Sequence, residues 1–273
     1  MNIQGVGKAG SFTSFIVKKS ILKKLVGGAI KNCQKHIDDQ IEGNNTSWLQ
    51  LQKVLQNVRG KGIATMIGKI ESKTVIVKVQ SASLAQHEYD IQRQLENMKG
   101  FIKYHCLFYC GGSKAYIEQF STVGENTKVC KNKGSDIGVI IMPYYTNGSL
   151  EDVLNKIEDL EKLKSILRTI ILNYSLAYRS LGYVHGDFFC KNIVLDSDNI
   201  PIIIDYEKSH FKHYRNCDIF WNDLDNLCLD MSKNKLLSQK MFDIARVFTI
   251  HRAYQQEPTE QVITDILRAI DNI

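Results

Sequence analysis

Short apolar runs in the first half of the chain predict strands. Residues 74–79 read TVIVKV, and β-branched side chains of this kind pack well on a pleated sheet. We expect a strand pair over residues 101–117 and a short buried strand over residues 138–142. The first half of the chain is therefore predicted to hold a mainly β unit.

Apolar residues spaced three and four apart predict helices elsewhere, because residues at this spacing share one face of a helix. Two short apolar runs, 193–195 and 200–204, interrupt this pattern and predict strands. After residue 206 the chain is expected to be largely helical to its end. Before that point, four segments show the helical spacing: residues 36–57, 81–98, 150–157 and 160–181.

A strand-rich first part followed by a helical second part predicts an α+β protein with two lobes. We place the junction near Pro143 to Thr146. The expected organisation is a basic leader with a helical extension over residues 1–57, a small mainly β N-terminal lobe over 58–143, and a mainly α C-terminal lobe over 144–273.

Composition narrows the class of protein. The chain has 273 residues, of which 44% are hydrophobic and 23% charged, and this excludes disordered and collagen-like proteins. No apolar run reaches the roughly 18–20 residues of a membrane span, so we expect no transmembrane segment. Seven scattered cysteines without a C-x-x-C pair argue against zinc. We expect reduced thiols and a cytoplasmic location, in a host cell or virion if the source is viral.

The charge is concentrated at the start of the chain. The net charge is +6, yet seven lysines and no acid precede Asp38. Such a leader can bind an anionic partner or a membrane surface. Over residues 16–30 apolar residues recur at helical spacing, which fits either a membrane-surface helix or a helix packed on the body. Basic and aromatic residues do not interleave beyond the leader, so we expect no specific nucleic-acid binding.

The strongest chemical signal is the segment HGDFFCKN at residues 185–192, followed by IIID at 202–205. Asp187 and Asn192 bracket a loop, and Asp205 ends an apolar strand where an unpaired carboxylate is costly to bury. Oxygen donors that converge in this way suit magnesium carrying nucleotide phosphates. A carboxylate free of metal can accept a proton from an attacking hydroxyl.

These motifs resemble the catalytic and metal-binding loops of the protein-kinase-like superfamily, H-R-D-x-x-x-x-N and D-F-G. Asp187 and Asn192 keep the five-residue step, and Asp205 follows after room for a hairpin. The resemblance implies a two-lobed kinase-like fold that binds ATP and Mg²⁺. It makes Asp187 the catalytic base and assigns Asn192 and Asp205 to the metal.

Upstream residues follow the order that this superfamily has. Lys78 in VIVK resembles the lysine that holds the α- and β-phosphates, and Glu88 resembles its acidic partner. Residues 140–150 resemble the hinge between the lobes, with Met142 gating the inner pocket. Tyr144 is the expected backbone donor to adenine, because Pro143 has no N–H.

The glycine loop over the phosphates matches only in part, through Gly60 and Gly62. Asp218 resembles the buried acid that supports the catalytic loop. Three further acids, Asp223, Asp225 and Asp230, are interpreted as a solvated helical face.

Several positions depart from the kinase pattern. Gly186 replaces the usual arginine, and Phe189 replaces a lysine near the transferred phosphate. Tyr206-Glu207 stands where the pattern has F-G. Nothing after Asp205 resembles A-P-E, which predicts a shortened C-terminal lobe.

The resemblance implies an ATP- and Mg²⁺-dependent kinase, with a protein serine or threonine hydroxyl as the expected acceptor. Similar compact forms occur among large DNA viruses and bacterial effectors. The H-G-D and I-D-Y-E motifs are also similar to aminoglycoside and choline phosphotransferases, so a small alcohol is the alternative acceptor. A third hypothesis is a pseudokinase or scaffold that uses the basic leader as an interaction arm.

Overall fold

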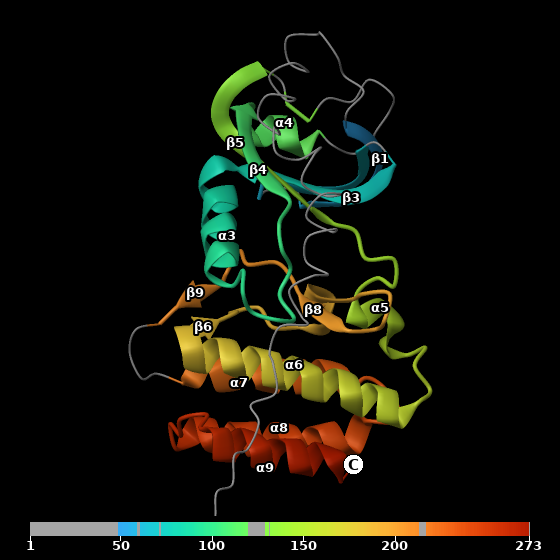
Figure 1. Ribbon diagram of the computed structural model, residues 1–273, viewed down its shortest axis with the longest axis vertical. Coiled ribbons are helices and arrows are strands. Elements are labelled where there is room, and N and C mark those ends of the chain that lie inside the picture. The colour runs from blue at the N-terminus through green and yellow to red at the C-terminus, as the bar shows by residue number, and fades with distance from the viewer. Residues whose placement is uncertain are drawn as a thin grey trace, which may run out of the picture.

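The computed structural model describes residues 49–58, 61–70, 72–119, 129–130, 132–212 and 217–272. The expectations for the lysine-rich leader and for Gly60 lie outside these residues. Figure 1 shows a sheet at one end of the molecule and helices α8 and α9 at the other, with α6 and α7 between them. The predicted α+β architecture, a mainly β N-lobe followed by a helical C-lobe, is confirmed.

The N-lobe is built on a five-stranded antiparallel sheet with the order β1-β2-β3-β5-β4. One of its faces packs into an apolar cluster that includes Met66, Val77 and Val139, all fully buried. Helix α3 packs beside the sheet in Figure 1. The elements of this lobe are β1 (Leu49–Val58), β2 (Ile63–Ile70), β3 (Lys73–Ser81), α3 (Ala82–Gln94), β4 (Cys106–Gly111), α4 (Lys114–Glu118) and β5 (Asn132–Pro143).

The helix expected over residues 36–57 is wrong for its described part, which is strand β1. Pairing with β2 is shifted between Leu51 and Lys53 and again between Val54 and Gln56. Each irregularity breaks the two-residue alternation of a strand, so apolar residues recur at a spacing that imitates a helix. The sheet therefore includes residues 49–57, which the sequence pattern places in the N-terminal extension.

The strand pair expected over residues 101–117 is also wrong. Only β4 is a strand, and it pairs with β5 rather than with a neighbouring hairpin arm. Ser113 accepts a hydrogen bond from the backbone of Tyr116 and caps the short helix α4 that follows. Ser113 stands three residues before the apolar pair Tyr116-Ile117, and a serine at this distance is a signal for the start of a helix. The β propensity of the surrounding residues hides this signal in the sequence.

The C-lobe packs around buried aromatic rings. Tyr174 stacks on Phe188 with ring centroids 4.4 Å apart and on Phe220 at 5.1 Å. Trp221 and Leu224 are fully buried beside them, as expected of core residues. The elements are α5 (Leu150–Leu154), α6 (Leu160–Leu181), β6 (Tyr183–Val184), η1 (Cys190–Asn192), β7 (Ile193–Leu195), β8 (Pro201–Ile203), β9 (His210–Phe211), α7 (Asp218–Met231), α8 (Ser238–Ala253) and α9 (Glu260–Asp271).

Helix α6 and strand β7 have the predicted bounds, and β8 lies within the predicted run. None of the helices in the described part of the chain combines the length and hydrophobicity that a membrane span requires.

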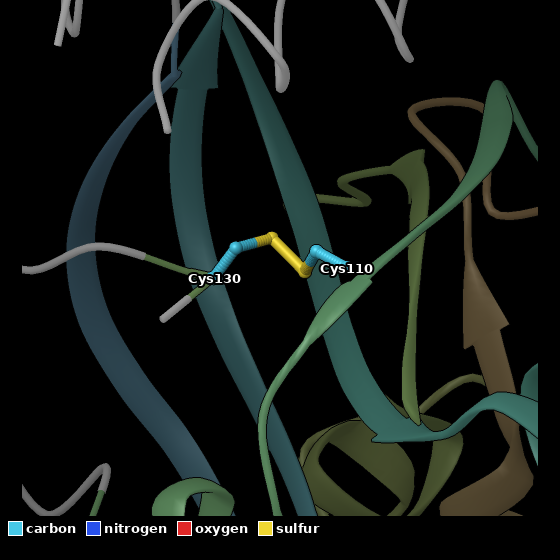
Figure 2. Close-up of a disulfide and its surroundings, with 2 residues drawn as sticks. All are labelled: Cys110 and Cys130. Carbon is cyan, nitrogen blue, oxygen red and sulfur yellow. A yellow bond between two sulfur atoms is a disulfide. The ribbon is translucent and has the colours of Figure 1, made fainter. Parts of the chain in front are cut away.

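A disulfide joins Cys110 at the end of β4 to Cys130, with 5.7 Å between the two Cα atoms (Figure 2). The expectation that all seven cysteines are reduced is therefore wrong for this pair. Disulfides persist mainly in oxidising environments. The cysteine content thus gives no support to the predicted cytoplasmic location. Cys190, Cys217 and Cys228 are free and buried in the C-lobe.

Candidate active site

A cleft of about 550 Å³ lies between the lobes. Pockets for small ligands commonly have volumes of this order, and nucleotide-sized molecules bind in them. Residues from β3, α3, the hinge, the catalytic loop and the segment after β8 meet at its walls. Of the predicted site residues, the structure places these along the cleft: Lys78, Glu88, Met142, Tyr144, Asp187, Asn192 and Asp205.

The ammonium of Lys78 is paired with the carboxylate of Glu88, at 2.6 Å from Nζ to Oε1. The ten-residue separation suffices because α3 begins directly after β3, where the side chain of Ser81 caps it. Glu88 is fully buried and accepts two more hydrogen bonds, from Gln80 at 3.0 Å and from the Tyr104 hydroxyl at 3.0 Å. A buried carboxylate with this many donors is rigidly placed.

Lys78 also donates to Oδ1 of Asp205 at 2.8 Å, which links strand β3 to the end of the β7–β8 hairpin. Burial acts to lower the pKa of Lys78, but Glu88 and Asp205 outweigh it and raise this pKa above its ordinary value. Burial acts to raise the pKa of Asp205, and the nearby Lys78 charge outweighs it and lowers this pKa. Both groups are therefore charged at neutral pH.

Asp205 has a positive φ of 64°. A residue other than glycine held in this conformation is strained and is typical of functional sites. The backbone before it is fixed on both sides, since Ile204 donates to the Asn192 carbonyl at 2.9 Å and its own carbonyl lies 2.9 Å from Nε2 of His185. His185 thus ties the backbone after β8 to the loop that carries Asp187.

The carboxylate of Asp187 is held by three donors. Asn192 donates through Nδ2 to Oδ2 at 3.0 Å, Lys208 donates to Oδ1 at 2.7 Å, and the Lys191 ammonium lies 3.2 Å from Oδ2. Burial acts to raise the pKa of Asp187, but the hydrogen bonds and charges of the two lysines outweigh it and lower this pKa. Asp187 is therefore an oriented, charged acceptor that faces the cleft.

The acid that supports the catalytic loop is Asp223 rather than the predicted Asp218. Its Oδ2 accepts hydrogen bonds from the backbone of His185 and of Gly186, each at 3.0 Å, and from the hydroxyl of Tyr174. Asp218 is the first residue of α7. Burial raises the pKa of Asp223, because hydrogen bonds to its charged form offset the loss of hydration only in part.

The interpretation of Asp223 and Asp230 as solvated is wrong. Asp223 is fully buried, and Oδ2 of Asp230 accepts from the backbone of Cys190 at 2.9 Å. These acids lie seven residues apart in the same stripe as Leu224 and Leu227, which are also buried. The sequence does contain a signal for this burial: the two carboxylates recur at helical spacing within a stripe of apolar residues.

The hinge contributes an apolar wall to the cleft. Met142 is buried on β5 opposite Ile76 of β3, and both line the cleft together with Val194 and Ile204. Apolar walls of this kind suit a purine ring. The roles of Met142 and Tyr144 toward adenine stay predictions.

Gly62 is not brought to the cleft wall. Its φ is +65°, and an added Cβ would lie 2.7 Å from Cγ of Lys114 on α4. The glycine is therefore required by a tight turn against α4. Its neighbour Lys61 does line the cleft, with Nζ 3.7 Å from Oε1 of Glu207.

The donor set fits magnesium. Both hydrogen bonds that Asn192 donates through Nδ2 go to Asp187, so its amide oxygen is the atom suited to a cation. Asp205 uses Oδ1 for Lys78, which leaves Oδ2 as a second oxygen ligand. Hard oxygen ligands from one carboxylate and one amide, completed by phosphate oxygens, are what Mg²⁺ prefers.

Residues 118–243 match the family model of the RIO domain, an atypical protein-kinase-like family. The matched segment is just under half of the chain and contains Asp187, Asn192 and Asp205, but not Lys78 or Glu88. No curated protein matches the chain. The match does not show the predicted resemblance to viral and bacterial-effector kinases or to aminoglycoside phosphotransferases. With the two-lobed α+β fold, it supports a divergent member of the kinase-like superfamily.

Proposed function

We propose that this protein is an ATP- and Mg²⁺-dependent kinase that phosphorylates a serine or threonine hydroxyl of a protein. The observation that carries the proposal is the convergence of Lys78, Asp187, Asn192 and Asp205 on one cleft between the lobes. These residues come from strand β3, the catalytic loop and the end of the β7–β8 hairpin. The RIO-domain match supports a kinase at the coarser level.

In the proposed reaction the acceptor hydroxyl oxygen forms a bond to the γ-phosphorus of ATP, while the bond from that phosphorus to the β–γ bridging oxygen breaks. The hydroxyl proton passes to the Asp187 carboxylate, and ADP keeps the electron pair of the broken bond. The charged carboxylate of Asp187, which is held by Asn192, Lys191 and Lys208, orients the hydroxyl and accepts its proton. Such catalysis rests mainly on positioning and on charge stabilisation.

Lys78 supplies a fixed positive charge for the phosphates, and Glu88 keeps its ammonium in place. Asn192 and Asp205 would hold magnesium. When bound, the ion neutralises the negative charge of the phosphate oxygens.

The charges around Asp187 favour a protein acceptor over a cationic small alcohol. Lys191 and Lys208 both contact the Asp187 carboxylate, and both side chains are about half exposed to solvent. An aminoglycoside or choline carries positive charge, and two lysines at the acceptor position repel it. A peptide hydroxyl has no such conflict.

The test is transfer of label from [γ-³²P]ATP, with Mg²⁺ present, to generic protein acceptors and to a panel of small alcohols. We expect labelled phosphoserine or phosphothreonine in the protein acceptors and no labelled aminoglycoside or choline. If label appears in small alcohols and in no protein acceptor, the protein is a small-molecule kinase instead. If the protein neither transfers label nor binds nucleotide, the scaffold hypothesis replaces the kinase.

A further inference from the structure

The catalytic loop lacks a basic residue at position 189, where the kinase pattern has a lysine near the transferred phosphate. Phe189 stands there, and the Lys191 ammonium lies 5.5 Å from the centre of its ring. A second cation reaches the same place from another part of the chain. Lys208, three residues after Asp205, brings Nζ to 2.7 Å from Oδ1 of Asp187.

The backbone of Lys208 is pressed against the catalytic loop at Gly186. Gly186 has a φ of +76°, and an added Cβ would lie 2.8 Å from the Lys208 carbonyl oxygen. A larger residue, such as the arginine of the kinase pattern, collides with that backbone. The glycine at position 186 therefore makes room for the segment that carries Lys208.

The segment around Lys208 is fixed by neighbouring Ser209, which is fully buried. Its hydroxyl donates to the His185 carbonyl at 3.2 Å, and its carbonyl lies 2.9 Å from Nε2 of His87 on α3. Its amide donates to the Tyr206 carbonyl at 3.0 Å. The lysine therefore projects from a rigid backbone that contacts both lobes, although its side chain is 53% exposed.

The charges at this point suit a phosphate. One carboxylate, Asp187, faces the two ammonium groups of Lys191 and Lys208, so this cluster of three side chains carries one positive charge in excess, while the neighbouring Glu207 is paired with Lys61. On the other side, Lys78 is paired with both Glu88 and Asp205, and its contact with Asp205 marks the expected place of the phosphates. The proposed reaction requires the γ-phosphoryl group of a bound nucleotide to lie next to Asp187, which the Lys191 and Lys208 ammonium groups contact.

We propose that Lys208 binds the γ-phosphoryl group of ATP and stabilises its charge during transfer, in place of the lysine that position 189 lacks. This inference rests on the proposed function, because it requires ATP in the cleft. It explains two departures from the kinase pattern. Lys208 takes the place of the lysine that is missing at Phe189, and Gly186 leaves room for the segment that carries Lys208.

The test compares the affinities of the full chain for ATP and for ADP, both with Mg²⁺, by isothermal titration calorimetry. Lys208→Met is expected to weaken ATP binding about tenfold, which corresponds to about 1.4 kcal/mol, and to leave ADP binding unchanged, because only ATP has the phosphoryl group that the ammonium would contact. Lys208→Arg keeps the charge and is expected to retain the preference for ATP. Lys235→Met is the matched control, because Lys235 is exposed and lies outside the cleft wall.

An unchanged ratio of ATP to ADP affinity in Lys208→Met overturns the inference and leaves the proposed function intact. The inference is also overturned if Lys208→Met prefers ATP as the wild type does but has a raised KM for the acceptor. In that case Lys208 binds the acceptor rather than ATP. If the wild-type chain binds no ATP, the proposed function fails first. Thermal melts identify a misfolded Lys208→Met, and in that case Lys208→Gln replaces it in the same comparison.

Discussion

Asp187→Asn is expected to reduce kcat about 10²- to 10⁴-fold, the range that a positioned general base contributes. The amide has the shape of the carboxylate but no charge to accept the hydroxyl proton. The hydrogen bond from Asn192 is 3.0 Å long and can be kept by the new side-chain oxygen. We therefore expect the variant to fold and to bind ATP as the wild type does, so that its loss of activity cannot be attributed to misfolding.

The measurement is single-turnover transfer of labelled phosphate at saturating ATP, with thermal melts of the same samples. Asp243→Asn is the matched control, since Asp243 is exposed on α8 and lies away from the cleft. An Asp187→Asn protein as active as the wild type would remove Asp187 as the base.

Asp223→Ala is expected to lower the free energy of unfolding by about 3 kcal/mol. The substitution removes the acceptor of the Gly186 amide and leaves the His185 amide only the Tyr174 hydroxyl, at 3.2 Å, and an unsatisfied buried donor costs about 1–3 kcal/mol. The gain from no longer burying a carboxylate offsets part of this loss, because burial raises the pKa of Asp223. For a chain of this size the melting temperature is expected to fall by about 6–12 °C.

Urea denaturation measures this change, and transfer activity is followed in the same samples below the transition. Asp223→Asn, which keeps one acceptor oxygen, is expected to lose less stability than Asp223→Ala. If Asp223→Ala unfolds at the same urea concentration as the wild type, the acid does not support the loop.

The meeting of Asp187, Asn192 and Asp205 at one cleft was predictable because its signal is local. The step from Asp187 to Asn192 and the apolar strand before Asp205 both lie within one short stretch of sequence. Strand β7 and helix α6 were equally clear, since each follows one undisturbed hydrophobic period. The structure adds what spacing does not contain, namely that Lys78 contacts Asp205 across the cleft.

The failures have tertiary causes. In β1 the irregular pairing with β2 displaces the strand period, so the sequence imitates a helix. The disulfide between Cys110 and Cys130 depends on a chain path that cysteine spacing does not reveal. Asp223 and Asp230 are buried because they lie in the apolar stripe of α7, whereas their charge alone predicts a solvated face.

The central claim is that Lys78, Asp187, Asn192 and Asp205 form one site for a magnesium-bound nucleoside triphosphate. The most direct test is calorimetric titration of ATP, with and without Mg²⁺, into the wild-type chain and into Asp205→Asn. The account predicts that Mg²⁺ strengthens ATP binding to the wild type and that Asp205→Asn loses this gain. Equal dependence on Mg²⁺ in the two proteins, or no ATP binding to the wild type, would contradict it.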